Sequence, residues 1–393
     1  MSEETVVIVS GARTPMGSLL GGLSTMTAPQ MGSVAIAEAL ERSGIAPADV
    51  DETFMGCVLP AGLGQSPARQ ASLGAGIPKS TGVVTLNKVC GSGMQAAMFA
   101  HDSIKAGTNK IVVAGGMESM SNAPHLIKDA RGGVRNGHKS LYDHMFLDGL
   151  EDAYTGGAMG SFAQKTADDR GITREQMDAY AIESLNRARS AIESGALKAE
   201  MAPVTVKTRK GDVLVENDEQ PYSADPAKIP NLRPAFAADG TITAANSSSI
   251  SDGASALVIT SGSEAEARGL KPMARILGHS RHSQEPSLFT TAPIGAVNKL
   301  LAKLDWTVDD VDLWEINEAF AMVVMMAIQD LGLDHSKVNV YGGGCAMGHP
   351  IGSTGSRIIV TLMYALQQMG KKRGIATLCI GGGEATAVAI ELL

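Results

Sequence analysis

The stretch DVDETFM (Asp49–Met55) and the stretch DVDLWEI (Asp310–Ile316) share a cadence of acid, apolar residue, acid and then an apolar run. About 40 positions after each of them comes a polar residue beside glycines, Cys90 in the first case and His349 in the second. A helical stretch follows each of these residues. Such self-similarity is what two copies of one supersecondary unit leave in a sequence. The spacing therefore predicts a fold of two similar halves.

The two halves also close alike, because IVVAGGMES (Ile111–Ser119) and TLCIGGGEA (Thr377–Ala385) are both apolar runs that reach glycines. Continuous apolar runs of this kind, with another at Val6–Ser10, are typical of strands buried on both faces of a sheet. We predict an α/β protein with two βαβ-rich halves whose strands end at one shared cleft, where open α/β sheets place ligands. Coincidence is the alternative, since strands that end in glycine are common. If the repeat holds, Cys90 and His349 meet in that cleft.

Residues 122–248 differ from both halves and are interpreted as an insert. Thr173–Gly195 has the spacing of an amphipathic helix and begins with a Thr173/Gln176 capping box. A short hairpin, Val204–Val206 with Val213–Val215 around Gly211-Asp212, is expected after it. The predicted division is a first half of residues 1–121 plus about 249–271, an insert of residues 122–248 for ligand and subunit contacts, and a second half of residues 272–393.

Composition limits the partners of the chain. With 393 residues and 44% hydrophobic content, it is long enough for two domains or one large two-lobed body. A net charge of −8 disfavours nucleic acid and anionic membranes as partners, because either would need a basic face. The longest apolar run, Ala319–Ile328, is about half of the ~20 residues that a membrane-spanning helix needs. The N-terminal residues also lack the pattern of a targeting segment, so we expect a cytoplasmic protein.

Four cysteines in a chain of this length form no disulfide framework, and the common zinc and redox spacings are missing. No metal is therefore expected, and each cysteine is interpreted singly. Cys90, in NKVCGSG, lies between a strand-like run and a helical stretch from Met94. Unpaired backbone N–H groups and the helix dipole favour a thiolate at such a place, which makes Cys90 a candidate nucleophile. The alternative is a small buried cysteine in a glycine-rich turn.

His349, Cys379 and Asn317 are candidates for moving protons and holding water. Pro350 disfavours a helical conformation for His349, so the imidazole would sit on a loop as an accessible base; a structural histidine is the alternative. Cys379 ends a predicted strand, and a thiol pKa of about 8.5 suits an acid and base; a core cysteine is its alternative. Asn317 begins the apolar run, where it can cap a helix or orient a water.

A set of segments together resembles the thiolase family, of the acetyl-CoA acetyltransferase and 3-ketoacyl-CoA thiolase group, over nearly the entire chain. They are ARTPMG (Ala12–Gly17), GQSPARQA (Gly64–Ala71), NKVCGSG, GGMESMS (Gly115–Ser121), LRPAF (Leu232–Phe236), ANSSSISDGA, NEAF, GHPIG and CIGGG. Four or five of these in this order are very specific. The resemblance implies a thiolase-like fold whose two halves stack as α/β/α/β/α layers, and an enzyme that moves acyl groups between coenzyme A thioesters.

The resemblance also implies the chemistry of the site. Cys90 takes the acyl group, His349 activates Cys90, and Cys379 moves the α-proton of the second substrate. Asn317 is expected to hold a water that stabilises the thioester enolate together with His349. The backbone N–H groups of Cys90 and Gly381 match the second oxyanion hole, which would face the carbonyl of the acyl-enzyme.

Contacts to the substrate carry over in the same way. Ser248 matches the serine that contacts the pantetheine arm, Met159 matches a methionine of the acyl pocket, and Phe289 stands where another pocket methionine is usual. Ala319 and Phe320 of NEAF are expected at the substrate as well. The implied partners are acyl-CoA and CoA as substrates, without a permanently bound cofactor. Family members are usually tetramers built as pairs of dimers, so a homotetramer is expected.

The chain departs from the short-chain pattern at Ala158, because related biosynthetic thiolases read GYHMG where this chain reads GGAMG. We expect the reversible condensation of two acetyl-CoA to acetoacetyl-CoA and CoA, by ping-pong chemistry. Thiolysis of longer 3-ketoacyl-CoA in fatty acid β-oxidation is the alternative. A ketoacyl synthase, which would carry a different pair at Asn317 and Cys379, and a catalytically silent acyl-CoA-binding homologue are further alternatives.

Overall fold

The computed structural model of the chain describes residues 4–393, so residues 1–3 of the predicted first half lie outside the described residues. One continuous sheet of ten strands runs through both halves; nine of them follow one order, and the tenth, β2 (Gly17–Ser18), pairs with β10 (Ser251–Ser261). In the first half the strand order is β4 (Gly82–Leu86), β3 (Glu52–Gly56), β5 (Ile111–Ser119), β10 (Ser251–Ser261), β1 (Val6–Arg13). The order continues into the second half as β11 (Ala274–Ser283), β14 (Glu384–Leu392), β13 (Arg373–Ile380), β12 (Leu313–Ile316).

The two halves of the sheet have the same topology. They meet where β1 and β11 pair, at Val7 with Arg275 and Ile8 with Ala274. In the first half, the last strand β10 lies beside the first strand β1, and β5 and β3 follow as a parallel pair. In the second half, the last strand β14 lies beside the first strand β11, and β13 and β12 follow as a parallel pair. A bridge between Trp314 and Val338 stands where β4 stands in the first half. The duplication predicted from the sequence is therefore confirmed.

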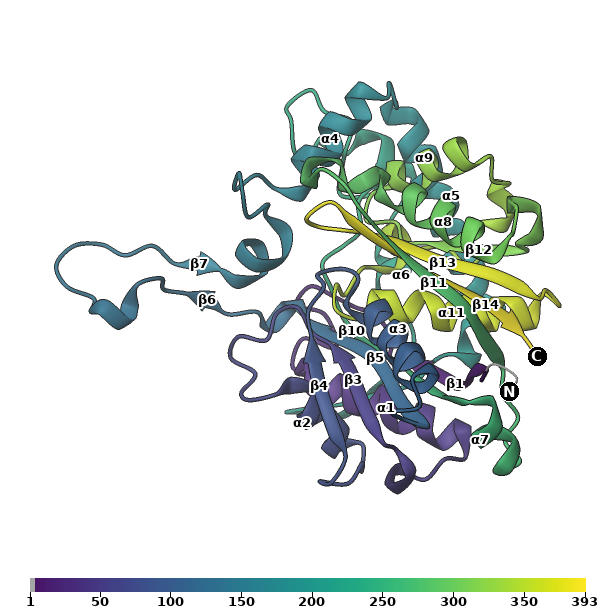
Figure 1. Cartoon of the computed structure of the whole chain (residues 1–393). Coiled ribbons are helices and arrows are strands. Elements are labelled where there is room, and N and C mark those ends of the chain that lie inside the picture. The colour runs from purple at the N-terminus through teal and green to yellow at the C-terminus, as the bar shows by residue number, and fades with distance from the viewer. Residues whose placement is uncertain (1–3) are drawn as a thin grey trace.

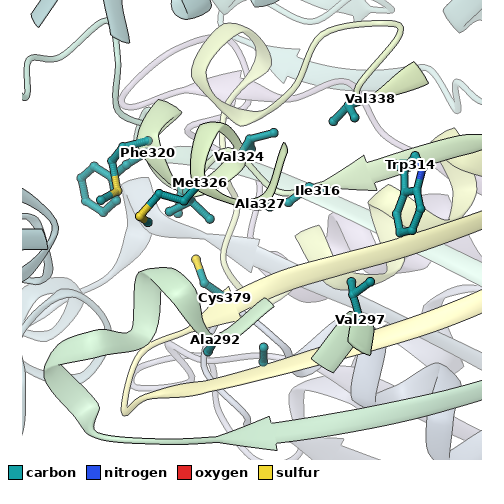
Figure 2. Packing of buried hydrophobic residues seen from close by; sticks show 14 of the residues in the cluster. Ala292, Val297, Trp314, Ile316, Phe320, Val324, Met326, Ala327, Val338 and Cys379 are labelled. Carbon is teal, nitrogen blue, oxygen red and sulfur yellow. The ribbon is translucent and has the colours of Figure 1, made fainter. Parts of the chain in front are cut away.

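Helices cover the two halves in three layers, as expected for an α/β/α/β/α stack (Figure 1). The outer helices of the first half are α1 (Ala28–Ser43) and α2 (Pro67–Gly74), and those of the second are α8 (Ala292–Leu304) and α9 (Ala321–Leu331). The central layer consists of α3 (Ser92–Lys105) and α11 (Thr354–Gln368), which share one core with strands of both halves. Figure 2 shows the second outer core, in which Trp314 of β12 and Val297 of α8 belong to one cluster of buried side chains.

Burial in the central layer explains two sequence patterns. Every residue of α11 from Thr354 to Leu366 is buried, because this helix has a neighbour on all sides. The strands β5 and β10 are buried along their whole length, which is why neither shows the alternation of apolar and polar residues that a half-exposed strand has.

Glycines let the halves approach at backbone distance. A Cβ on Gly116 would lie 1.9 Å from the carbonyl oxygen of Gly352, and one on Gly355 would lie 2.4 Å from the backbone nitrogen of Met94. No side chain other than hydrogen fits at such contacts. The loops that precede α3 and α11 are thereby brought together.

The segment between β5 and β10 contains α4 (Met159–Asp169), α5 (Arg174–Glu193) and the hairpin of β8 (Val204–Thr208) and β9 (Gly211–Val215). The predicted capping box of Thr173 is present at the start of α5. The turn of the hairpin, however, is Arg209-Lys210 and not Gly211-Asp212, because Thr208 pairs with Gly211 and closes a two-residue loop. The short strands β6 (His125–Leu126) and β7 (Tyr142–Asp143) belong to an arm that projects from the body (Figure 1).

Short elements complete the described chain: β2 (Gly17–Ser18), α6 (Gln220–Ser223), α7 (Gly262–Ala267) and α10 (Gly344–Met347). Most of the apolar run noted in the sequence forms α9, which packs in the outer core of the second half. Between residues 4 and 393, no helix has both the length and the apolar character that crossing a membrane requires.

Candidate active site

Cys90 lies in a tight turn between β4 and α3 that side chains hold in place. Asn87 Oδ1 accepts the N–H of Val89 at 2.8 Å, and Ser92 Oγ accepts the N–H of Lys88 at 2.8 Å while donating to the Val89 carbonyl at 2.7 Å. Val89 has φ +47°, a conformation that a β-branched residue rarely adopts. Strained strand-to-helix turns of this kind present a nucleophile at their apex. The sequence predicted the turn from its glycines but gave no sign of the strain at Val89.

The structure does not favour the expected thiolate at Cys90 in the resting protein. Burial raises the pKa of the Cys90 thiol to about 11, although the backbone N–H groups of Gly381 and of Cys90 itself point at the sulfur and act in the opposite direction. The helix α3 begins only at Ser92, so its dipole does not overcome the cost of a buried charge. Cys90 therefore rests as a neutral thiol.

His349 is buried rather than freely accessible, with 5% of its surface exposed. Its Nδ1 lies 2.6 Å from Thr354 Oγ1, which itself donates to the Pro350 carbonyl at 3.0 Å, so we assign the ring proton to Nδ1. The lone pair of Nε2 then lies on the other side of the ring, where Asn317 Nδ2 approaches to 3.4 Å. Burial, with the positive charge of Arg357, lowers the pKa of His349 to about 3, which keeps the imidazole neutral.

Asn317 does not cap the apolar helix. The helix α9 begins at Ala321 with Phe320 as its N-cap, because residues 317–320 remain extended after β12 and the Asn317 N–H continues the strand pairing with the Thr377 carbonyl at 3.0 Å. The side chain of Asn317 instead reaches His349, and its buried Oδ1 has no hydrogen-bond partner within the described residues. A buried amide oxygen in this state is a free acceptor for a water or a substrate group.

Cys379 is buried near the end of β13, the strand that the repeat equates with β5. In Figure 2 its sulfur rises from β13 on the side where Phe320 and Met326 lie. Burial and the neighbouring Cys90 both raise the pKa of the Cys379 thiol, so it holds its proton at neutral pH. The chain then turns at Gly381, whose N–H faces the Cys90 sulfur.

One cavity of about 390 Å³ brings the predicted residues together. The chemical groups on its wall come from both halves of the fold: Cys90, His349, Cys379 and Gly381. All predicted substrate contacts also line it, namely Ser248, Met159, Phe289, Ala319 and Phe320. Asn317 meets the cavity only through His349. The described side chains around the cavity carry no formal charge, which favours an uncharged acyl group.

An aromatic cluster forms part of the cavity wall. The ring of Phe320 meets those of Phe289 and Phe236 edge to face, with centroids 6.4 Å and 6.2 Å apart. Gly160 is required under Phe236, since a Cβ there would lie 2.1 Å from the ring. Ala158 lines the same wall. Sequence reasoning placed Phe289 and Phe320 here but missed Phe236, although LRPAF was among the recognised segments.

Thr354 was also missed, even though it fixes the tautomer of His349. The only signal in the sequence is a hydroxyl residue about one helical turn after the histidine, which many unrelated segments share. Its significance appears only when the loop and the first turn of α11 are seen together.

Comparison with known proteins agrees with the fold and the geometry. Residues 6–263 match the family described as "Thiolase, N-terminal domain" and residues 270–392 match "Thiolase, C-terminal domain". The chain is 47% identical over 393 residues to an acetyl-CoA acetyltransferase of Schizosaccharomyces pombe, with 100% of both chains covered. It is 50% identical over 391 residues to acetyl-CoA acetyltransferase 2 of Arabidopsis thaliana, which covers 99% of this chain and 97% of that protein.

A solved structure shares the same architecture. The crystal structure of Acat5 thiolase from Ascaris suum in complex with coenzyme A superimposes with a TM-score of 0.94 at 44% sequence identity. The match covers 99% of this chain and 100% of that chain.

Proposed function

The chain belongs to the thiolase family of acyltransferases, and from that premise we propose that it is an acetyl-CoA C-acetyltransferase. It would catalyse the reversible condensation of two acetyl-CoA molecules to acetoacetyl-CoA and CoA. The observation that carries the proposal is the convergence of two thiols and a neutral imidazole, drawn from both halves, on one uncharged cavity. The relatives from Schizosaccharomyces pombe and Arabidopsis thaliana are both acetyl-CoA acetyltransferases, which supports the acetyl group as substrate.

In the direction of thiolysis, the first half-reaction cleaves a carbon–carbon bond. Cys90 attacks the 3-keto carbon of acetoacetyl-CoA, and its proton passes to Nε2 of His349 as the carbon–sulfur bond forms. The bond between C2 and C3 then breaks, and the carbanion at C2 takes the proton of Cys379. Acetyl-CoA leaves, with acetyl-Cys90, a protonated His349 and a Cys379 thiolate remaining. The protonated resting state of Cys379 supports its role as the acid of this step.

The second half-reaction restores the enzyme. The thiol of CoA gives its proton to the Cys379 thiolate, and the resulting CoA thiolate attacks the carbonyl of acetyl-Cys90. The sulfur–carbon bond to Cys90 breaks, and Cys90 recovers its proton from His349. Both half-reactions conserve a thioester, so the condensation of two acetyl-CoA follows the same steps in reverse.

Two sets of hydrogen-bond donors would stabilise the negative charge that develops. We expect Asn317 to hold a water that acts with His349 on the enolate oxygen, and the unpartnered Oδ1 of Asn317 supports this role. The N–H groups of Cys90 and Gly381 would form the other oxyanion hole, facing the acetyl-Cys90 carbonyl. Their present direction toward the Cys90 sulfur supports the assignment.

Coenzyme A is the proposed partner of the cavity, since the Ascaris suum thiolase was solved with coenzyme A. Ser248 would contact its pantetheine arm from the end of the insert, shortly before β10, where its N–H donates to the Ala319 carbonyl at 2.9 Å. The division into residues 1–121 with 249–271, 122–248 and 272–393, the homotetramer and the cytoplasmic location stay predictions.

A thiolysis assay with acetoacetyl-CoA and CoA tests the proposal. The wild-type chain should consume acetoacetyl-CoA, and acetyl-CoA alone should add one acetyl group to Cys90, detected by mass spectrometry of peptides. The variant Cys90→Ala should lose at least about 10³-fold in kcat, because the nucleophile is gone. Wild-type protein that neither cleaves acetoacetyl-CoA nor carries an acetyl group would refute the function and favour a silent acyl-CoA-binding homologue.

A preference for longer acyl chains is the second candidate, and one observation favours it. Ala158 lines the cavity with a small side chain, at the position where related biosynthetic thiolases carry the histidine of GYHMG. The values of kcat/KM for 3-ketoacyl-CoA substrates of increasing length decide between the two. We expect acetoacetyl-CoA to be preferred, because the bulky rings of Phe289 and Phe320 stand on the cavity wall and leave less room for a long acyl chain. Replacing Phe289→Ala should shift the preference toward longer chains, whereas an unchanged order would contradict the assignment of this wall.

A further inference from the structure

Glu118 is a fully buried carboxylate that takes no part in the mechanism above. It lies near the end of β5 with 0% of its surface exposed and does not line the cavity. Its Oε2 accepts the N–H groups of Val58 at 3.0 Å and Gly352 at 2.9 Å, and its Oε1 accepts that of Leu59 at 3.1 Å. Three backbone donors on one buried carboxylate form a built site rather than a chance contact.

The three donors come from opposite halves of the fold. Val58 and Leu59 follow β3 in the first half, whereas Gly352 stands in the second half between His349 and Thr354. Thr354 fixes the ring of His349. The Glu118 carboxylate therefore binds the chain at Gly352, between His349 and the threonine that orients its imidazole.

Gly352 packs closely against the end of β5. A Cβ on Gly352 would lie 2.6 Å from Glu118 Oε2 and 2.7 Å from the Met117 carbonyl oxygen. Next to it, Ile351 packs with Val58 and Leu59 in a small core that Cys90 also touches. Glu118 thus joins the turn that follows His349 directly to the loop of Val58 and Leu59, and this loop packs in the cluster that Cys90 touches.

Burial raises the pKa of Glu118 to about 7, so its carboxylate is charged above neutral pH and then also acts on the nucleophile. Its carboxylate contributes to the raised pKa of Cys90, after the larger effect of burial. A residue with a purely structural role in a distant core would leave the titration of Cys90 untouched, so this effect offers a specific readout.

We propose that Glu118 is a positioning residue of the acyl transfer, whose carboxylate holds the turn from His349 to Thr354 against the loop of Val58 and Leu59 and so sets the imidazole against the Cys90 sulfur. The inference rests on the proposed function. A neutral amide of the same shape can accept fewer of the three N–H groups, because its NH₂ side repels them.

Kinetics of Glu118→Gln and Glu118→Asp test the proposal in the full chain. We expect Glu118→Gln to lower kcat for thiolysis of acetoacetyl-CoA about 10- to 100-fold with KM changed less than about threefold, as for other residues that orient a catalytic histidine. Glu118→Asp keeps the charge and should recover part of kcat. The matched control is Asp51→Asn, whose carboxylate accepts the N–H groups of Lys110 and Ile111 far from the cavity, and kcat there should stay near the wild-type value.

Alkylation of Cys90 by iodoacetamide provides the second readout. Its rate against pH should move to lower pH in Glu118→Gln, because a negative charge near the sulfur is lost, and should move little in Asp51→Asn. An unchanged kcat in Glu118→Gln, or a fall that the control shares while the alkylation profile stays fixed in every variant, would overturn the proposal.

The wild-type protein supplies a test in case the variants do not fold. Hydrogen exchange of the N–H groups of Val58, Leu59 and Gly352 should be as slow as that of β5 residues, and rapid exchange would overturn the proposal. Exchange and alkylation need no turnover, so they report on positioning even if the wild-type chain fails the thiolysis assay and the proposed function falls.

Discussion

Cys90 and His349 are both neutral in the resting protein, so the proton must leave the sulfur while the new bond forms and not before. A thiolate–imidazolium pair would raise the pKa of the imidazole. Burial instead disfavours the charged form of both Cys90 and His349. A neutral thiol is also less reactive toward alkylating reagents than a thiolate.

The pH dependence of Cys90 alkylation tests this resting state. The rate with iodoacetamide should rise about tenfold for each pH unit between pH 7 and 10, since only the thiolate reacts and its pKa is about 11. Peptide mass spectrometry identifies the alkylated cysteine, with Cys90→Ala as the blank. A rate that is already flat below pH 8 would show that the sulfur is ionised at rest.

Asn317 offers a prediction that separates two steps of the reaction. In Asn317→Ala, thiolysis of acetoacetyl-CoA should slow about 10²- to 10³-fold, the usual loss for one oxyanion-hole group. Exchange of label between acetyl-CoA and CoA, which needs no enolate, should fall much less. The exposed Asn298→Ala on α8 is the control and should leave both rates unchanged. Equal losses in both assays would place Asn317 in the positioning of His349 instead.

The roles of single residues were predictable only where the local pattern carried the reason. Cys90 was identified from its strand–glycine–helix setting, and His349 from the proline and glycines around it. The neutral tautomer of His349 depends on Thr354, and the suppressed thiolate of Cys90 depends on burial that both halves create. The sequence shows that the hydroxyl and thiol groups are present, but it does not show how deeply the folded protein buries them.

At the scale of elements, the glycines of β5 and of the loop before α11 determine how closely the halves meet. Gly116→Ala should destabilise the protein by about 1–3 kcal/mol or more, because its Cβ would displace the Gly352 backbone. Urea unfolding measures the loss. The strand glycine Gly82, where a Cβ would meet only ordinary contacts, provides the control Gly82→Ala. Equal stability of the two variants would refute the close approach.

Elements with strong local signals followed the sequence, while their ends depended on tertiary contacts. The capping box at Thr173 fixed the start of α5, since both of its hydrogen bonds are local. The hairpin turn shifted to Arg209-Lys210, because the pairing of Thr208 with Gly211 is decided across the strands. The apolar helix began after Asn317 rather than at it, since Asn317 first completes the pairing with Thr377.

At the scale of the whole molecule, α3 and α11 bury one core that belongs to neither half alone. Urea unfolding should therefore be a single transition. Both tryptophans, Trp306 and Trp314, lie in the second half, so their fluorescence reports that half while far-UV circular dichroism reports both. The two midpoints should coincide. A fluorescence transition displaced from the dichroism transition would show that the halves unfold separately.

The overall architecture was predictable because the duplication repeats spacing as well as composition. Residues 49–55 and 310–316 lead into the equivalent strands β3 and β12, and the last strand of each half returns to lie beside the first. The seam between β1 and β11 was not predictable, since only two residue pairs join the halves there and neither strand marks them.

The backbone contact of Gly116 with Gly352 constrains how such a chain can be recombined. A chimera that takes its first 270 or so residues from one homologue and the remainder from another would have to fit a carbonyl oxygen from one parent into a space shaped by the other, to within about one bond length. Gene shuffling at this junction should consequently yield many proteins that fold but are inactive, unless all loops that flank the contact come from the same parent.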